Sequence, residues 1–105
     1  GVEGIDRFEG DVRDSFPKAR FAGDCVCKPL DHGDCAAVDY FDTNANMEAM
    51  RDQAIEWALY FNTKYVILYD RIYEETNGFM PQVYTGDFHY HIHVSVYGGI
   101  SRSAC

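Results

Sequence analysis

The sequence predicts an α+β domain in which a small, mostly antiparallel sheet packs with two helices. Two segments, 5–16 and 47–62, repeat apolar residues at helical spacing. Two others, 64–69 and 88–97, are rich in the β-branched and aromatic residues that favour strands. The order of elements, helix, two strands, helix, strand, loop and strand, is typical of an α+β layer.

Length and charge narrow the classes of function. The 105 residues are expected to form one domain, spanning 1–105, and a monomer. The formal net charge of −8 argues against a nucleic-acid partner, because phosphate binding needs a basic surface. No run of about 18 apolar residues is present to span a membrane. The polar opening, residues 1–4, does not match a signal peptide, so we expect a processed or excised domain.

The N-terminal half is expected to hold one helix and two strands. The helix covers 5–16 and is followed by strands at 19–27 and 36–41. A proline and a glycine mark the intervening segment, 28–34, as a loop. Residues 42–46 have the composition of a turn and a helix cap.

The C-terminal half is expected to hold the longer helix and two strands. The helix covers 47–62, and its apolar stripe is expected to face the core. The strand at 64–69 comes next. Segment 74–87 is predicted to be a loop because of its Asn-Gly pair and its proline. The strand at 88–97 closes the fold.

Three of the four histidines lie in this last strand. Alternate side chains of a strand point to opposite faces. One face therefore carries the polar set His89, His91, His93, Ser95 and Tyr97. The other face carries a set suited to core packing, Tyr90, Ile92, Val94 and Val96. Packing alone would hardly select a row of imidazoles, because protonated neighbours repel, whereas a metal keeps them unprotonated.

His32 and Asp39 can complete a metal site with this strand. A lone histidine in a strand is usually structural, and His-x-His alone supplies too few ligands for a tetrahedral site. Asp39, however, lies in the middle of a short apolar strand, where a carboxylate is costly unless it is paired or binds a metal. His32 lies in the preceding loop. Together with the His-x-His strand, these residues predict a metal site.

The four cysteines, at 25, 27, 35 and 105, are expected to form disulfides. Their spacing does not match a zinc ribbon, and two bridges with three possible pairings are allowed. One bridge is expected to tie the C-terminus to the loop between Cys25 and Cys35. Disulfides imply an oxidising compartment and hence a secreted protein; the alternative is four reduced thiols.

These motifs resemble one family of zinc peptidases. The pattern begins with His-x-x-x-x-x-x-Asp at His32 and Asp39, followed by a long helix. It continues with Tyr-Val-Ile at 65–67, Arg-Ile-Tyr at 71–73 and His-Ile-His-Val-Ser-Val at 91–96. Across residues 5–98 the chain is similar to the lysostaphin / D-alanyl-D-alanine peptidase / hedgehog superfamily, and within it to the D-alanyl-D-alanine carboxypeptidase-like branch.

The resemblance implies a fold, a metal and a reaction. It implies the hedgehog/D-Ala-D-Ala-peptidase-like fold and a zinc held by His32, Asp39 and His93, with a fourth position open to water. Such a zinc would lower the pKa of water and polarise the scissile carbonyl. His91 matches a position beside the metal that assists catalysis, and Arg71 matches one that contacts substrate or braces the site. The implied activity is hydrolysis of stem-peptide or cross-bridge amides of peptidoglycan, in a secreted or phage-lysin-like protein.

The sequence departs from the family pattern at two positions. Cys35 replaces a glycine of the His…Asp motif. Tyr90 stands where the family has an acidic general base, so the base would be His91 alone or a carboxylate from the preceding loop, Asp87, Glu74 or Glu75. The alternative function is therefore a zinc-containing binding module of the same fold without turnover. A third is a disulfide-bonded secreted protein whose histidines are only a surface.

Overall fold

The computed structural model describes residues 2–23, 25–42 and 46–97. Its helices are α1 (Val2–Ser15), α2 (Met47–Glu56) and a short 3-10 helix, Glu75–Asn77. Its strands are β1 (Arg20–Ala22), β2 (Ala37–Phe41), β3 (Thr63–Tyr69), β4 (Arg71–Glu74), β5 (Pro81–Val83) and β6 (His89–Val96). No helix in the described part of the chain is long and apolar enough to cross a membrane.

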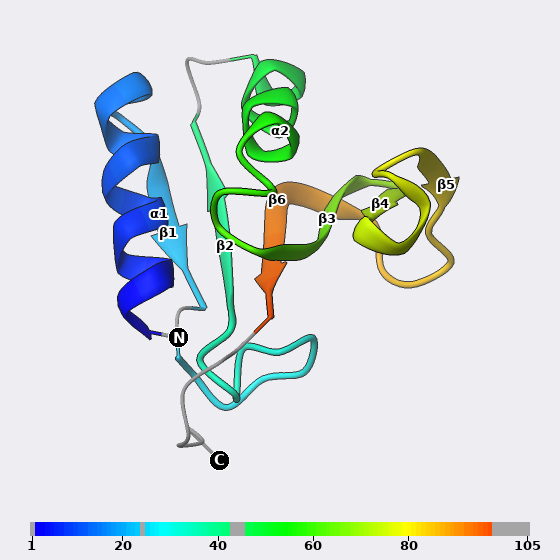
Figure 1. Ribbon diagram of the computed structural model, residues 1–105, viewed down its shortest axis with the longest axis horizontal. Helices are drawn as coiled ribbons and strands as arrows, with labels where there is room; N and C mark the ends of the chain where they lie inside the picture. The colour runs from blue at the N-terminus through cyan, green and yellow to red at the C-terminus, as the bar shows by residue number, and fades with distance from the viewer. Residues whose placement is uncertain (1, 24, 43–45, 98–105) are drawn as a thin grey trace.

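The strands form one antiparallel sheet in the order β1-β2-β6-β3-β4-β5 (Figure 1). The predicted α+β class with a small antiparallel sheet and two helices is confirmed. The histidine strand β6 lies in the middle of the sheet, between β2 and β3. Side chains on β6 therefore have neighbours on both sides, which fixes their positions.

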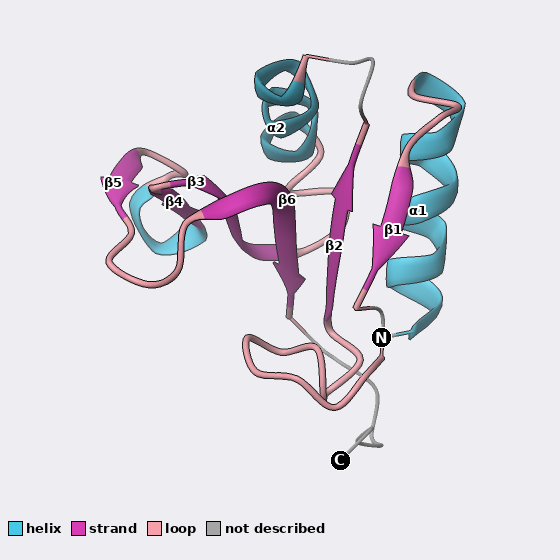
Figure 2. Cartoon of the chain, turned by 180° about the vertical axis from the view of Figure 1, so that it is seen from behind, coloured by secondary structure: helices cyan, strands magenta, loops and turns pink. Residues whose placement is uncertain are grey.

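Both helices contribute to one apolar core. Ile5, Phe8 and Val12 of α1 and Met50 of α2 are fully buried in it. The ring of Phe8 meets the ring of Tyr40 edge-on at 5.6 Å between centroids. Figure 2, seen from behind, shows the sheet from the side opposite to that of Figure 1. The core residues of β2, β3 and β6 alternate with residues on the other face, and that other face carries His93 and Asp39.

Two predicted elements are shorter in the structure. The strand predicted at 19–27 is reduced to β1, because Gly23 and Cys25 have φ of +75° and +52° and turn the chain away. The helix predicted at 47–62 ends at Glu56. Beyond Glu56 the chain forms a series of turns that ends at Asn62, which has a φ of +55°. The Thr63 N–H then donates a hydrogen bond to the Ala58 carbonyl at 2.8 Å.

The prediction of a loop over 74–87 is wrong. Tyr69, with a φ of +57°, reverses the chain so that β4 pairs with β3, and β4 then carries β5 at the edge of the sheet. Pro81 pairs with Tyr73 in β5. An edge strand tolerates a proline because its outer side has no partner for the missing N–H. Pro81 therefore begins a short edge strand, and Asn77 and Gly78 end the 3-10 helix that connects β4 to β5.

The predicted alternation of β6 holds, but Tyr90 is not buried. Ile92, Val94 and Val96 belong to the core, as expected, whereas Tyr90 is 78% exposed. The pairing with β3 is irregular here: Ile67 faces His93 and Tyr69 faces His89, so two steps on β3 match four on β6. Such a shift of two residues keeps the alternation in phase, and the ring of Tyr90 lies beside that of Phe88 at 4.8 Å.

Candidate metal centre

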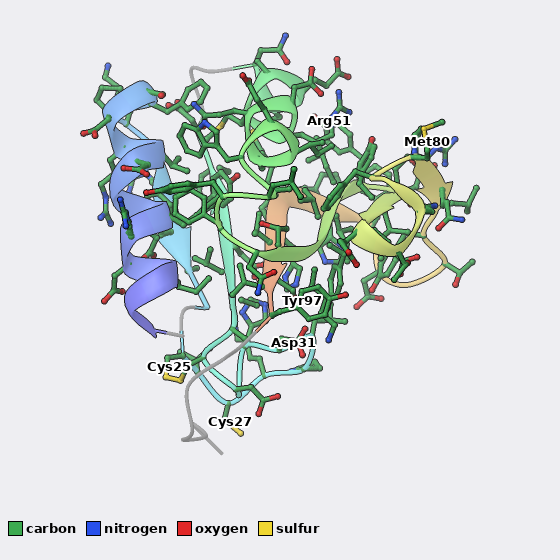
Figure 3. All side chains as sticks on the ribbon, viewed as in Figure 1. Cys25, Cys27, Asp31, Arg51, Met80 and Tyr97 are labelled. Carbon is green, nitrogen blue, oxygen red and sulfur yellow. A yellow bond between two sulfur atoms is a disulfide. The ribbon has the colours of Figure 1, made fainter. Side chains whose placement is uncertain are left out.

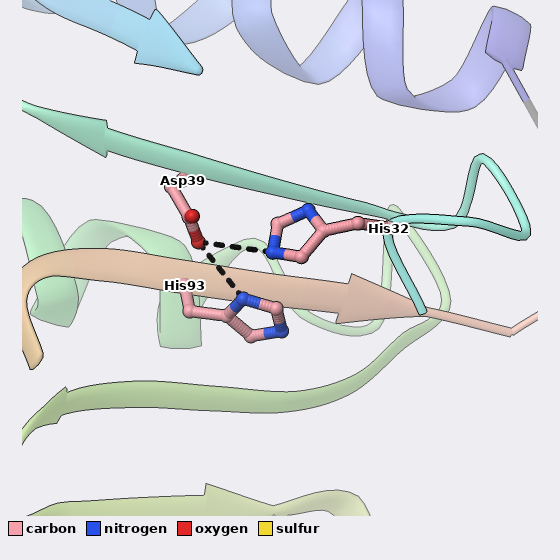
Figure 4. A group of neighbouring side chains, drawn as sticks. All are labelled: His32, Asp39 and His93. Carbon is pink, nitrogen blue, oxygen red and sulfur yellow. Dashed lines mark hydrogen bonds and ion pairs between the residues drawn. The ribbon is translucent and has the colours of Figure 1, made fainter. Parts of the chain in front are cut away.

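His32, Asp39 and His93 converge at one point in the structure. Their candidate ligand atoms all lie within 4.8 Å of one another. His32 comes from the loop before β2, Asp39 from β2 and His93 from β6 (Figure 4). Asp39 and His93 are directly paired across the two strands. The structure thus brings together the three ligands that the sequence predicts, and these residues could hold a metal ion.

The orientation of His32 is set by the backbone of Gly23. Nδ1 of His32 donates a hydrogen bond to the Gly23 carbonyl at 2.7 Å. This bond places the proton on Nδ1 and leaves Nε2 unprotonated, 3.4 Å from Oδ1 of Asp39. A Cβ on Gly23 would lie 2.9 Å from the His32 ring. Only glycine therefore allows this approach, and it also allows the φ of +75° found here.

A disulfide encloses the loop that carries His32. Cys25 is bonded to Cys35, as expected for at least one bridge, and the Cys35 N–H donates to the His32 carbonyl at 3.1 Å. Figure 3 shows Cys25, Cys27 and Asp31 gathered at the end of the molecule where this loop lies. The predicted bridge to Cys105 lies outside the described residues.

His93 is held by Ser95 and Leu30. Ser95 Oγ donates to the Leu30 carbonyl at 3.3 Å, so its one proton is used. It must then accept the proton of His93 Nε2, which lies 2.8 Å away. Nδ1 of His93 is left unprotonated, 2.9 Å from Oδ1 of Asp39. The ring of Tyr65 stacks on His93 at 5.6 Å, and His93 is completely buried.

With both histidines neutral, this arrangement leaves a place for a cation beside Asp39. Two neutral imidazoles, His32 and His93, direct lone pairs at the same carboxylate oxygen of Asp39. A lone pair facing an anion repels it unless a proton or a metal ion lies between them. The donor set therefore fits a metal ion bound by His32 Nε2, Asp39 Oδ1 and His93 Nδ1.

The pKa values of the three groups describe the metal-free protein, in which a histidine proton takes the place of the cation beside Asp39. Burial opposes ionisation of Asp39, but hydrogen bonds from His32, His91 and His93 in their protonated forms outweigh it and hold the pKa of Asp39 far below its usual range. Burial lowers the pKa of His93 in spite of Asp39. For His32, burial is outweighed by the hydrogen bond and charge of Asp39, and its pKa is raised. Without a metal, His32 retains a proton more readily than His93.

An open pocket of about 220 Å³ gives access to this cluster. Its lining consists of Lys28, Pro29, Leu30, His32, Asp39, Tyr84, Asp87, Phe88, His89 and His91. His91 is half-buried, and its Nε2 lies 3.3 Å from Oδ1 of Asp39. His89 donates from Nδ1 to the carbonyl of Asp87 at 2.7 Å and packs against His91 at 5.1 Å between centroids.

The remaining candidates differ in their distance from the pocket. Asp87 lines it. Arg71 is exposed at the start of β4, where its guanidinium pairs with Asp70 at 3.2 Å, and it does not line the pocket. Glu75 accepts a hydrogen bond from the Tyr97 hydroxyl. Neither Glu74 nor Glu75 lines the pocket.

Sequence reasoning missed the groups that orient the two histidines. Ser95 was placed on the correct face of the strand, but only the position of the Leu30 carbonyl reveals what its hydroxyl does. Gly23 carried a signal, since a glycine inside a predicted strand marks a bend or a close approach. No family model, curated protein or solved structure matches this chain.

Proposed function

We propose that this domain is a zinc-dependent peptidase that hydrolyses stem-peptide or cross-bridge amides of peptidoglycan. One observation carries the proposal. Nε2 of His32 and Nδ1 of His93 face one oxygen of Asp39 beside an open pocket, while the other nitrogen of each ring has a separate hydrogen-bond partner. The motif resemblance adds the substrate class and the hedgehog/D-Ala-D-Ala-peptidase-like fold.

Zinc is the metal that suits this donor set best. Two imidazoles and one carboxylate match the borderline character of Zn²⁺, whereas Mg²⁺ and Ca²⁺ prefer six or more oxygens. Three protein ligands leave one tetrahedral position for water or substrate, as in catalytic zinc sites. Zinc bound here would lower the pKa of water and polarise the scissile carbonyl. The fixed tautomers of His32 and His93 support this role, because each ring already presents the nitrogen that binds.

His91 is the residue that we assign to proton transfer. Amide hydrolysis needs a group that takes a proton from water and returns one to the leaving amine. His91 Nε2 lies close to the Asp39 carboxylate, and its partly exposed ring forms part of the pocket wall. Asp87 is the alternative base, since it lines the same pocket.

The pocket and the charge of the domain suggest a small substrate. A domain with a net charge of −8 is not attracted to an anionic cell wall, which favours soluble muropeptides or a separate targeting module. Lys28 at the pocket wall suits a substrate carboxylate. Arg71 would contact only parts of a substrate that extend beyond the pocket.

A binding module without turnover is the second candidate. It is favoured by Tyr90, which stands where the family has an acid and points into solvent instead of the pocket. Such a module would retain the metal and bind the same peptides without cleaving them.

The test is hydrolysis of defined muropeptides by zinc-loaded protein, with products identified by mass spectrometry. We expect peptide products from the wild type and a kcat about 10²–10⁴-fold lower in His91→Ala with zinc retained. Gln82→Ala, on the exposed edge strand β5, serves as the control and should retain activity. Full activity in His91→Ala would transfer the role to Asp87. Zinc-loaded wild type that binds muropeptides but leaves them intact would favour the binding module.

A further inference from the structure

Three aromatic rings form a continuous exposed row at one rim of the pocket. The row consists of Tyr69 at the end of β3, Phe88 just before β6 and Tyr90 within it. Phe88 stacks on Tyr69 at 5.7 Å between centroids and lies 4.8 Å from Tyr90. Phe88 is 50% exposed and Tyr90 is 78% exposed, while Tyr69 is half-buried. The aromatic row is therefore held by mutual ring contacts and open to solvent.

The exposed end of the row lies where the pairing of β3 with β6 is irregular. Two steps on β3 match four on β6 between Ile67 and Tyr69. Tyr90 is exposed here, whereas Ile92, two residues further along the same strand, is buried. Exposed clusters of large apolar side chains commonly mark a binding surface, and bulges often re-aim a side chain near a functional site.

The aromatic row is continuous with the pocket. Phe88 lines the pocket together with His89 and His91, whereas Tyr69 and Tyr90 lie outside its lining. The row thus runs from the candidate metal centre onto open surface. A molecule that places one part in the pocket would lay its next part across these rings.

We propose that the aromatic row binds a neutral sugar ring joined to the peptide whose amide lies in the pocket, an inference that rests on the proposed peptidase function. The C–H face of a pyranose packs on an aromatic ring, and the tyrosine hydroxyls and the Asp87 carboxylate offer partners for sugar hydroxyls. An N-acetylated hexosamine is uncharged, and amide linkage to a peptide neutralises a sugar-borne carboxylate. A neutral ligand avoids the repulsion that a domain with a net charge of −8 exerts on an anionic one.

Other occupants fit the aromatic row less well. Since Tyr69 and Tyr90 do not line the pocket, the row offers no hollow for an apolar peptide side chain. Three side chains are far fewer than the roughly 20–30 residues that each partner contributes to a stable protein interface. The net negative charge disfavours an anionic membrane surface. A flat sugar ring matches the shape of the row.

Calorimetry with two ligands tests the proposal on the zinc-loaded protein. One ligand is a stem peptide, and the other is the same peptide joined to an N-acetylated disaccharide; the uncleaved complexes are measured at low temperature. We expect the sugar to tighten binding about tenfold, as one or two aromatic contacts would. In Tyr90→Ala and in Phe88→Ala the ratio of the two affinities should fall toward one. Leu59→Ala, which removes an apolar side chain that is 90% exposed after α2, should keep the wild-type ratio.

A second measurement separates this proposal from the peptidase function. The peptide-free disaccharide is titrated into the protein, and amide chemical shifts are followed by NMR with and without zinc. Shifts at Phe88 and Tyr90 support the sugar site even if no amide is ever cleaved. Equal affinity of wild type for both ligands, or equal losses for both ligands in Tyr90→Ala, would overturn the sugar site while leaving the peptidase proposal intact.

Discussion

Ser95 Oγ accepts a hydrogen bond from Nε2 of His93 at 2.8 Å, two residues away on the same buried face of β6. Because the Ser95 hydroxyl also donates to the Leu30 carbonyl, the direction of this bond is fixed. The proton of His93 is thereby kept on the nitrogen that faces away from Asp39. Partners of this kind set the tautomer and raise the basicity of a ligating histidine.

Ser95→Ala should therefore weaken zinc binding by about 10–100-fold without abolishing it. The loss follows because Nε2 of His93 would be buried without an acceptor and its ring would be free to change tautomer. Competition with a chromophoric chelator measures the affinity. Ser15→Ala, at the exposed end of α1, is the matched control. Unchanged affinity in Ser95→Ala would mean that Ser95 does not orient the ligand.

Zinc binding at about pH 6.5, the ordinary pKa of histidine, should release about one proton, mostly from His32. The raised pKa of His32 means that it is mostly protonated there, whereas the lowered pKa values of His93 and Asp39 leave both groups mostly unprotonated. Affinity should accordingly rise with pH until the raised pKa of His32 is passed. Calorimetry in buffers of different ionisation enthalpy counts the protons. Release of none, or of two, would contradict this assignment.

Gly23→Ala should lower both stability and zinc affinity. The added Cβ would lie 2.9 Å from the His32 ring, on a backbone whose φ of +75° disfavours a side chain. Gly10→Ala is the matched control, because a Cβ there meets nothing within 4 Å and lies in α1. In that helix alanine should raise the free energy of unfolding by about 0.5–1 kcal/mol. Urea denaturation and chelator competition distinguish the two glycines.

Removal of the disulfide between Cys25 and Cys35 should loosen the loop that carries His32. Its ends are 10 residues apart, so the Cys25→Ser/Cys35→Ser variant should lose about 2–3 kcal/mol of unfolding free energy. Zinc affinity should fall as well, because His32 would no longer be held against Gly23. Thiol counting on the denatured, non-reduced wild type gives the direct check. Four free thiols would rule out the bridge.

The sequence was most informative where the alternation of side chains in a strand coincided with a residue whose burial is costly without a partner. Alternation in the last strand placed His89, His91 and His93 on one face, and the cost of a carboxylate in β2 singled out Asp39. The motif resemblance then selected His93, and the structure pairs His93 with Asp39 directly.

The strands β4 and β5 were missed because the proline and Asn-Gly were interpreted as parts of one long loop. Pro81 instead begins the edge strand β5, and Asn77 and Gly78 lie in the connection between the two strands. Periodicity also grouped Tyr90 with Ile92 for core packing, because the pattern of a strand indicates the face of a residue and not whether another element covers that face.

The contacts that orient the site were beyond sequence reasoning for a different reason. The hydrogen bond from His32 to Gly23 and the one from Ser95 to Leu30 both end on backbone carbonyls. Any residue supplies a carbonyl, so residue identity does not reveal such a partner. Only the path of the loop, set by left-handed residues such as Cys25 and Leu30, brings these oxygens into place.

Metal content after zinc loading and dialysis at neutral pH tests the central claim most directly. Inductively coupled plasma mass spectrometry should find one zinc per wild-type chain and none in His93→Ala, because a site with three protein ligands does not hold the metal when one ligand is lost. Asp39→Asn keeps the shape of the side chain and removes the charge that both histidines face, so a loss of zinc in this variant is not explained by misfolding. We expect Asp39→Asn to lose its zinc as well. Circular dichroism confirms the fold of each variant. Stoichiometric zinc in folded His93→Ala or Asp39→Asn would contradict the assignment.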